Sequence, residues 1–421
     1  MVFLKINSMR RILFSMAMLL LLISCCKDSE QGKIHKNDKF VPIALTKSQG
    51  EITMNVNDLG FDVLSEILHD TESDVSSDLM ISPLSLSSAL AMCVNGADGS
   101  TKDQMLSLLG INDGDIADLN SYYALMLDAL VRADKEVDFI SANSLWHRPS
   151  IILNDAYKKN VSETFDAEVN SADFTSASCV ERINGWCSSK TNNMIPVIMT
   201  KPDPLVMVKL LNALYFKGMW MNAFDQAKEK PFRHEDGRVS NEKTIVDKIE
   251  LKCAQTSLFK CVEIPYGNGA YVMNLLLPSK GVSLADASTS LSDGEWEKLT
   301  SSFRYNIVNL EFPTFEIKSD IEFSKILMRL GMSDAFCDEA DFSNMSDVPL
   351  CITSVSQYSM IKVNEKGTEA STVTNIDLGE TIAPGPDNSQ EEIFEFIADR
   401  PFFYIIRESS TGVILFVGKK S

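Results

Sequence analysis

The hydrophobic positions of the chain follow two spacings, the first of which is helical. Between residues 56 and 68 they recur every three or four positions, as Val56, Leu59, Val63, Leu64, Ile67 and Leu68. This period predicts an amphipathic helix with one face in the core. Ser82-Pro83 precedes another apolar segment, which runs to Met92.

The second spacing is that of strands, in short apolar stretches rich in β-branched and aromatic residues. These stretches are 206–216, 270–277, 306–312, 402–407 and 413–418. Because helical and strand-rich parts of the chain are partly segregated, the pattern favours an α+β fold over repeated βαβ units. No repeat of fixed period and no long Pro/Gly/Ser linker interrupts residues 51–421, so we expect one large domain there.

Residues 1–24 have the pattern of a targeting segment. Lys5, Arg10 and Arg11 precede an apolar run from position 12 to position 23, which has the length of a signal h-region and is too short to span a bilayer comfortably. The tetrapeptide Leu-Ile-Ser-Cys at 22–25 is similar to a bacterial lipobox. That similarity implies cleavage before Cys25 and lipidation of its thiol. An ordinary secretory signal with an incidental Cys is the alternative.

Residues 25–50 are polar and lack helical periodicity, so we expect a flexible tether between the lipid and a domain at 51–421. The expected location is the bacterial cell envelope, facing the periplasm or the cell surface. The membrane would be contacted through the lipid alone, because no later apolar run is long enough to span it.

Composition and charge exclude several classes of protein. Of the 421 residues 45% are hydrophobic and 23% are charged, which is typical of a globular domain rather than a disordered or fibrous one. The formal charge of −19 argues against nucleic-acid binding, because a phosphate-binding surface needs a basic excess. Removal of residues 1–24 would leave 36 cations and 58 anions, a charge of −22.

The chemistry-bearing residues form no recognisable catalytic or metal motif. Apart from Cys25 and Cys26 there are seven scattered Cys and no Cys-x-x-Cys, which favours buried free thiols over a disulfide framework or a zinc site. The four His are isolated, and hydrolase, metalloprotease and nucleotide-binding motifs are absent from the sequence. We therefore expect no catalytic residue, no metal and no cofactor.

Several segments in a fixed order carry a family resemblance. The most specific are Leu211–Trp220 (LNALYFKGMW) and Asp399–Arg407 (DRPFFYIIR), and shorter matches begin at Ile81, Asn143 and Ile183. Together they resemble the serpin superfamily over nearly all of residues 50–421. The resemblance implies an α+β serpin fold with three β-sheets, about eight or nine helices and an exposed reactive-centre loop at about 366–392.

The segment 363–374 resembles the hinge of inhibitory serpins. Its hinge residues are Glu365, Gly367, Thr368, Glu369, Ala370, Ser371 and Thr372. The resemblance implies a monomeric suicide substrate whose partners, serine proteases or cysteine proteases, are trapped as covalent acyl complexes while the loop inserts into the main sheet. A non-inhibitory serpin that acts as a surface binding protein is the alternative. A surface enzyme or a carbohydrate-binding lipoprotein is disfavoured, because no site chemistry is visible.

The alternation of side chains in this segment supports a strand without reference to the family. From Thr368 to Gly379 the even positions are uncharged, whereas the odd positions include both acids, Glu369 and Asp377. A strand places alternate residues on opposite faces, so one face could enter a core while both carboxylates face solvent. A solvated Ser/Thr-rich loop or an edge strand is the alternative.

Five further residues match positions that control opening of the main sheet in the family. They are Ser82, Ser85, Asn212, Trp220 and Gln357. Position 357 is a departure, because most members carry a His there, and Gln cannot become a cation. The alternative for all five is that they only form the hydrogen bonds that any buried polar side chain needs in a core.

The reactive bond follows from the family's spacing of sixteen residues after the hinge Glu. From Glu365 this gives Thr381-Ile382, which implies an elastase-like or subtilisin-like target because Thr is small and uncharged. The bonds Glu380-Thr381 and Leu378-Gly379 remain alternatives.

Overall fold

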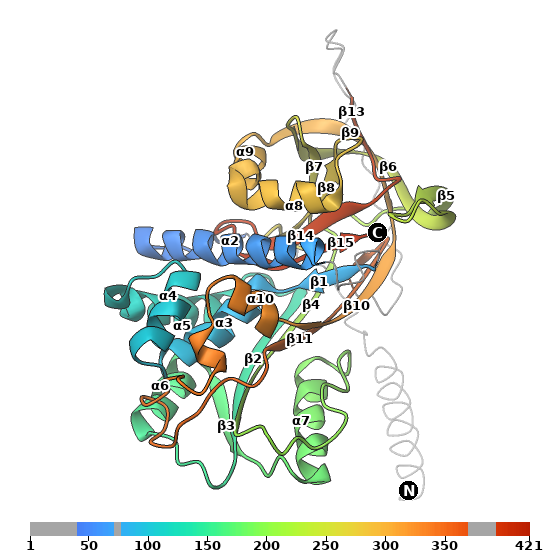
Figure 1. The fold of residues 1–421 in the computed structure, drawn as a ribbon. Coiled ribbons are helices and arrows are strands. Elements are labelled where there is room, and N and C mark those ends of the chain that lie inside the picture. Colours follow the sequence, from blue (N-terminus) through green and yellow to red (C-terminus); the bar gives the residue numbers. More distant parts are fainter. Residues whose placement is uncertain (1–39, 71–76, 369–392) are drawn as a thin grey trace, which may run out of the picture. The chain divides into compact units, whose positions relative to one another are not determined.

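The computed structural model describes residues 40–70, 77–368 and 393–421. Within these ranges the chain forms helices and two hydrogen-bonded sheets (Figure 1). The α-helices of the described residues are α2 (Lys47–His69), α3 (Pro83–Val94), α4 (Gly99–Leu108), α5 (Ile116–Arg132), α6 (Asp155–Phe165), α7 (Ala177–Lys190), α8 (Leu284–Ser290), α9 (Trp296–Ser301) and α10 (Ser324–Arg329). Shorter turns are η1 (Asp113–Asp115), η2 (Leu291–Glu295) and η3 (Asp334–Phe336).

A six-stranded sheet holds the site. Its order is β10 (Phe315–Glu322), β11 (Ser356–Asn364), β12 (Gly367–Thr368), β4 (Val208–Met219), β2 (Val137–His147) and β3 (Ala167–Ser171). Its pairs are antiparallel except for β2 with β3. Helix α7 packs on one face through Trp146, Ile183 and Ala213, in a small cluster separate from the main core.

A nine-stranded sheet supplies most of the main core. Its order is β1 (Leu79–Ile81), β15 (Ile414–Lys420), β14 (Phe402–Glu408), β8 (Tyr271–Pro278), β7 (Phe259–Pro265), β6 (Val239–Gln255), β9 (Arg304–Pro313) and β13 (Phe394–Ile397), with β5 (Lys228–Arg233) beside β6. The predicted α+β architecture is confirmed. The expected three sheets, however, form two hydrogen-bonded networks, because the 17-residue β6 pairs with β5, β7 and β9 along its length.

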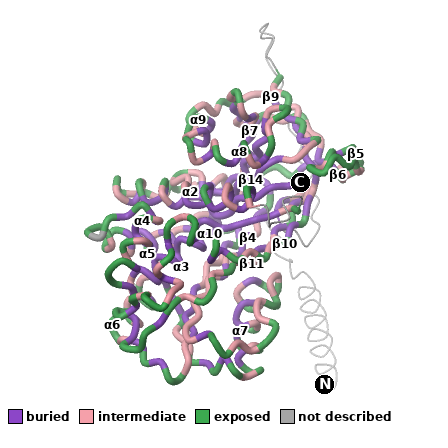
Figure 2. The backbone as a smooth tube through the Cα atoms, viewed as in Figure 1, coloured by how far each residue is buried: buried purple, intermediate pink, exposed green. Residues whose placement is uncertain are grey.

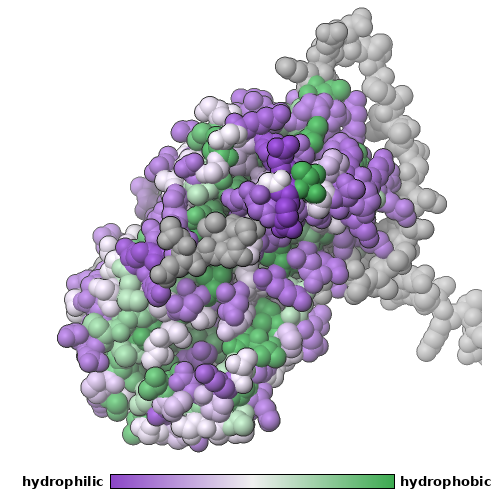
Figure 3. Space-filling model, turned by 45° about the vertical axis from the view of Figure 1, so that its right-hand side comes forward, coloured by the Kyte–Doolittle hydropathy of each residue, from purple (hydrophilic) through white to green (hydrophobic). Residues whose placement is uncertain are grey.

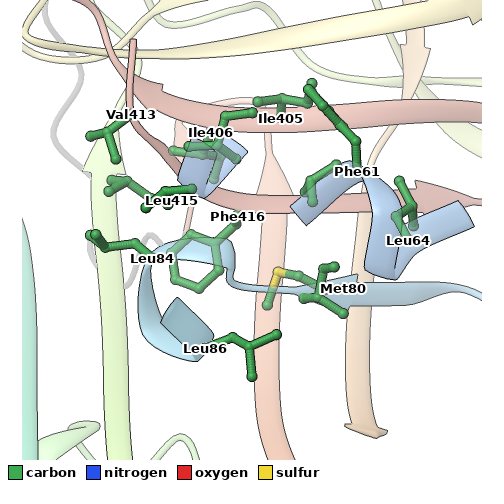
Figure 4. Close-up of a cluster of buried hydrophobic side chains, with 14 of the residues drawn as sticks. Phe61, Leu64, Met80, Leu84, Leu86, Ile405, Ile406, Val413, Leu415 and Phe416 are labelled. Atoms are coloured by element: carbon green, nitrogen blue, oxygen red, sulfur yellow. The ribbon is translucent and has the colours of Figure 1, made fainter. Parts of the chain in front are cut away.

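The core is continuous from α2 and α3 onto β14 and β15. Figure 4 shows Phe61 and Leu64 of α2, Leu84 of α3 and the strand residues Ile405 and Phe416 as members of one buried cluster. Figure 2 shows the buried residues concentrated in these central elements. Apolar burial at this density stabilises the scaffold that carries the site.

The predicted elements agree with the structure, but the predicted tether is too long. Helix α2 and strands β4, β8, β9, β14 and β15 cover the predicted segments. The tether was expected to reach residue 50, yet α2 begins at Lys47, and Ile43 packs against the core and donates its N–H to Ser410 at 2.9 Å. A capping box between Thr46 and Gln49 fixes the earlier start of the helix.

The described surface mixes polar and apolar residues, as one face shows in Figure 3. Among the described residues, no helix is both long enough and apolar enough to cross a membrane. All seven described Cys are free; five are buried as predicted, whereas Cys337 is half-buried and Cys351 is exposed. The predicted signal segment and Cys25 lie outside the described residues.

Candidate functional site

The hinge is a tight turn that returns the chain into the sheet. Strand β11 ends at Asn364, residues Glu365 and Lys366 form the turn, and β12 follows directly. Gly367 lies opposite Asn364 and Met219, and Thr368 lies opposite Val363 and Gly218. Gly367 and Thr368, which fall within the predicted exposed loop at about 366–392, are therefore paired on both sides, whereas residues 369–392 lie outside the described residues.

Position 367 can be occupied without strain only by Gly. Its φ is +152°, and a Cβ there would lie 2.2 Å from the Gly218 carbonyl oxygen and 2.6 Å from the Met219 Cα. Both neighbours are backbone atoms of the adjacent strand, which cannot move aside as a flexible side chain can. The Gly is thus needed for β12 to approach β4.

Thr368 points into the protein, as the alternation of side chains predicts. It is 2% exposed, and its hydroxyl shares a 2.7 Å hydrogen bond with the Tyr266 hydroxyl. Burial raises the pKa of Tyr266 far above its ordinary value, so that hydroxyl keeps its proton and can donate. The hinge residues Glu369, Ala370, Ser371 and Thr372 lie outside the described residues.

Trp220 and Glu365 hold the turn from two sides. Trp220 stacks on Tyr266 with ring centroids 4.4 Å apart. Its indole N–H donates to the Asn364 carbonyl and its backbone N–H donates to the Lys366 carbonyl, both at 2.9 Å. The Glu365 carboxylate accepts the backbone N–H of Ala227 at 3.2 Å. These bonds satisfy the polar groups of the turn and fix where the hinge begins.

The other predicted sheet-opening residues are linked by hydrogen bonds lower in the same sheet, where the Ser85 backbone N–H also donates to the Ser82 hydroxyl at 3.3 Å. Ser85 of α3 donates to the Asn212 side chain on β4, and Asn212 donates to Asn143 of β2 at 2.6 Å. The Gln357 side chain of β11 accepts the Ser82 N–H at 2.6 Å and donates to the Ser82 carbonyl at 3.2 Å. Gln357 thus uses both of its functions as a neutral group.

A slot lies between β4 and β11 below the hinge. In the described sheet, β11 connects to β4 only through the two residues of β12. Residues 208–212 of β4 are half-buried although the strand is internal to the sheet. A cavity of about 100 Å³ is lined here by α3, β4, β11 and Ile198 of the connection after α7. The row of backbone groups facing the slot can accept a further strand.

Three of the predicted residues, Ser85, Asn212 and Gln357, line the slot. Ser82 is bonded to Gln357, and Trp220 lies at the hinge. The structure also shows two partners that sequence analysis missed, Tyr266 and Asn143. Tyr266 lies 102 positions from Thr368, and no local pattern relates the two. Asn143 lies in a segment used for the family resemblance, but its amide bond to Asn212 follows only from the pairing of β2 with β4.

Within the described part of the chain, no group of three or more His, Cys, Asp or Glu could hold a metal ion. His69 is the last residue of α2, His147 ends β2 and His234 follows β5. The predicted reactive bond Thr381-Ile382 lies outside the described residues.

Fold and site together define an α+β protein whose main sheet receives the start of its own hinge segment. Residues 54–421 match the family model described as Serpin (serine protease inhibitor). The chain therefore belongs to the serpin family.

Relatives of this chain come from distant organisms. Iripin-3 of Ixodes ricinus is 30% identical over 88% of this chain and 94% of its own length. The leukocyte elastase inhibitor of Sus scrofa is 30% identical over 83% of this chain and 94% of its own. The native structure of the thermophilic serpin Tengpin matches with a TM-score of 0.79 and 28% identity, covering 90% of this chain and 96% of that chain.

Proposed function

We propose that the protein is a suicide-substrate inhibitor of serine proteases. The observation that carries the proposal is the position of Gly367 and Thr368, which already bridge β4 and β11 at the mouth of the slot. In the chain that follows Thr368, Glu369 is succeeded by the small residues Ala370, Ser371 and Thr372. Small side chains lower the steric barrier to entry between two strands, which favours an inhibitory serpin over a non-inhibitory one.

The mechanism is a race between two reactions of one acyl-enzyme. The protease serine attacks the carbonyl carbon at the reactive bond, forms an ester and releases the new amino terminus with a proton from the protease His. Water would normally hydrolyse that ester. If the cut loop first inserts as a strand, the attached protease is dragged along, and a small distortion of its oxyanion hole stalls hydrolysis. The inhibitor itself supplies no catalytic residue.

The predicted target is an elastase-like or subtilisin-like protease. Thr381 precedes the predicted scissile bond and is small and uncharged, so a small apolar pocket accepts it and a pocket with a buried Asp gains nothing. The name of the Sus scrofa relative, leukocyte elastase inhibitor, supports the same class. Mass spectrometry of the fragment released from a denatured complex identifies the cleaved bond. A fragment beginning at Ile382 supports Thr381-Ile382, whereas a fragment beginning at Thr381 or Gly379 would assign cleavage to an alternative bond and change the expected class of target protease.

Incubation with a panel of serine and cysteine proteases tests the function itself. We expect an SDS-resistant complex with elastase or subtilisin and loss of protease activity in proportion to the complex. Clean loop cleavage with every protease still active would support the alternative, a serpin that acts as a surface binding protein.

We further propose that Cys25 anchors the protein to the bacterial cell envelope. The support is the lipobox-like sequence at 22–25 after a 12-residue apolar run. A Cys25→Ser variant should leave the membrane fraction while keeping its inhibitory activity. A variant that stays in the membrane fraction would argue against the lipid anchor. Lipid anchoring would place the inhibitor where it can protect the envelope from proteases.

A further inference from the structure

Lys209 of β4 is a half-buried cation that lines the slot. Its ammonium makes no hydrogen bond or ion pair with another described residue, and burial lowers its pKa. The charge of Asp203 partly opposes that shift, but the Asp203 carboxylate accepts the backbone N–H of Leu205 at 2.9 Å. A partly desolvated ammonium without a direct partner is unfavourable, so the site is suited to an anion that comes from outside the protein.

A serine lines the same cavity from the side of β11. It is Ser354, two positions before that strand begins. Thr368 of β12 pairs with Gly218 on β4 and with Val363 on β11, so these two partners lie at the same level of the sheet. Lys209 comes nine residues before Gly218, and Ser354 comes nine residues before Val363. Because β4 and β11 run in the same direction, Ser354 lies about level with Lys209 across the slot.

Both side chains lie on the same face of the sheet. On β4 the odd positions face α7, as Ala213 shows by packing in the cluster of that helix, so Lys209 takes this outer face. On β11 the odd position Val363 is buried and points inward with its partner Thr368, so the even position Ser354 faces outward. An ammonium and a hydroxyl, both hydrogen-bond donors, therefore lie at the outer mouth of the cavity.

The rest of the cavity is mainly apolar. Its lining includes side chains that belong to the main core or pack against it, namely Leu90, Leu210, Phe323 and Leu350. The cavity volume is about 100 Å³, roughly three times the volume that one water occupies in the liquid. A linear chain of about four to six carbon atoms suits a space of this size and gains free energy by leaving water.

We propose that this cavity binds a small amphipathic carboxylate, whose head group pairs with Lys209 and Ser354 and whose short apolar chain enters the space between β4 and β11. The ammonium and the hydroxyl can each donate to one carboxylate oxygen. A purely apolar molecule would leave the ammonium unpaired, and a small inorganic anion would leave the apolar space unfilled. The site goes beyond the proposed function, because binding needs only the intact inhibitor and no protease.

Three probes of graded chemistry test the site on the full chain. Hexanoate carries both the charge and the apolar chain, hexanamide keeps the shape without the charge, and acetate keeps the charge without the chain. Isothermal titration calorimetry measures the affinity of each probe, and thermal melts measure the stability that it adds. We expect hexanoate to raise the melting temperature of the intact protein in a concentration-dependent way. Hexanamide and acetate should each bind at least tenfold more weakly.

Substitution of the cation identifies the residue that holds the head group. Lys209→Met keeps most of the side-chain length but removes the charge, so it should weaken hexanoate binding about tenfold or more, the size expected for loss of a charge-assisted hydrogen bond. Its affinity for hexanamide should stay the same, which a collapse of the cavity would not allow. Lys209→Arg should retain hexanoate binding. Lys228→Met, on the exposed strand β5, is the matched control for net charge and should bind all three probes as the unmodified protein does.

The outcomes that would overturn the site are distinct from those that would overturn the proposed function. Equal affinity for hexanoate and hexanamide, or undiminished hexanoate binding by Lys209→Met, would show that the ammonium does not recognise a carboxylate. Acetate binding as tight as hexanoate binding would show that the apolar space takes no part. A protein that binds hexanoate as expected but traps no protease would overturn the proposed function and leave the carboxylate site standing.

Discussion

At the scale of residues, the hinge depends on two side-chain properties, the absence of a Cβ at 367 and a small hydroxyl at 368. Because Gly367 has no Cβ, the Gly218 carbonyl oxygen can lie 2.2 Å from the position that a Cβ would occupy. The second fills a site that is 2% exposed and shares a hydrogen bond with Tyr266. The neighbours of Gly367 lie on β4, and the partner of Thr368 lies in the turn between β7 and β8. Substitutions at either position should therefore act through these contacts.

Thr368→Arg should leave the loop cleavable but abolish trapping of proteases. An Arg at this site would have to bury its charge beside Tyr266 without a carboxylate partner, a cost on the order of 3–5 kcal/mol. Gel analysis with elastase measures complex against cleaved protein. Thr289→Arg on α8, where the side chain is exposed, is the matched control and should trap normally. An SDS-resistant complex of Thr368→Arg at normal yield would contradict the inward orientation.

Gly367→Ala should open the hinge. The added methyl group would clash with the backbone of Gly218 and Met219, and strain of this kind costs about 1–3 kcal/mol. We expect faster hydrogen exchange in peptides that cover 363–368 and 215–220. Gly50→Ala is the control, because a Cβ at this position in α2 meets nothing within 4 Å and should stabilise the helix by about 0.5–1 kcal/mol. Unchanged exchange in Gly367→Ala would mean that β12 is not held in the sheet.

At the scale of elements, hydrophobic periodicity predicts which residues of an element face the core better than it predicts the residue at which the element starts. The apolar positions of α2 are those that the helical period selects. Its beginning differs from the prediction because Thr46 and Gln49 form a capping box within the polar stretch that precedes the apolar positions. Likewise the alternation after Gly367 predicts which face Thr368 takes, but pairing with Tyr266 depends on the turn between β7 and β8, far away in sequence.

The contact of α2 with η2 and α9 predicts a pH effect. Partial burial, and then the charges of Glu297 and Asp62, raise the pKa of Asp58 from 3.8 to about 6. A carboxyl whose pKa is higher in the folded protein binds a proton more readily there than in the unfolded chain. Its contribution therefore raises the free energy of unfolding as pH falls from about 6 toward 4, and lowers it above pH 6.

Asp58→Asn should consequently raise the melting temperature at pH 7.5 and reduce the change in melting temperature between pH 7.5 and pH 5. Thermal melts at the two pH values measure both effects. Asp103→Asn on α4, where the side chain is exposed, is the control and should change neither. A lower melting temperature for Asp58→Asn at pH 7.5 would show that the charged carboxylate stabilises this contact instead.

At the scale of the whole molecule, the described sheet is incomplete along β4 and β11. Two residues of β12 occupy the mouth of the slot, and below them the facing backbone groups lack a strand between them. A native state of this kind leaves hydrogen bonds and apolar burial unrealised. Residues 369–392 join Thr368 to the strand β13, which begins at Phe394; under the proposed mechanism, full entry of this segment follows a cut.

Cleavage of the loop between about 378 and 383 should therefore raise thermal stability. The inserted residues would pair with both facing strands, and each such hydrogen bond adds about 1 kcal/mol net. We expect this gain to exceed the cost of ordering the segment, so the melting temperature of the cleaved protein should rise by several degrees or more. Differential scanning calorimetry of intact and cleaved protein measures it. Cleaved Thr368→Arg is the control that should gain little, because its segment cannot pass the first inward position. Equal melting temperatures for the intact and cleaved unmodified protein would mean that the slot does not take up the loop.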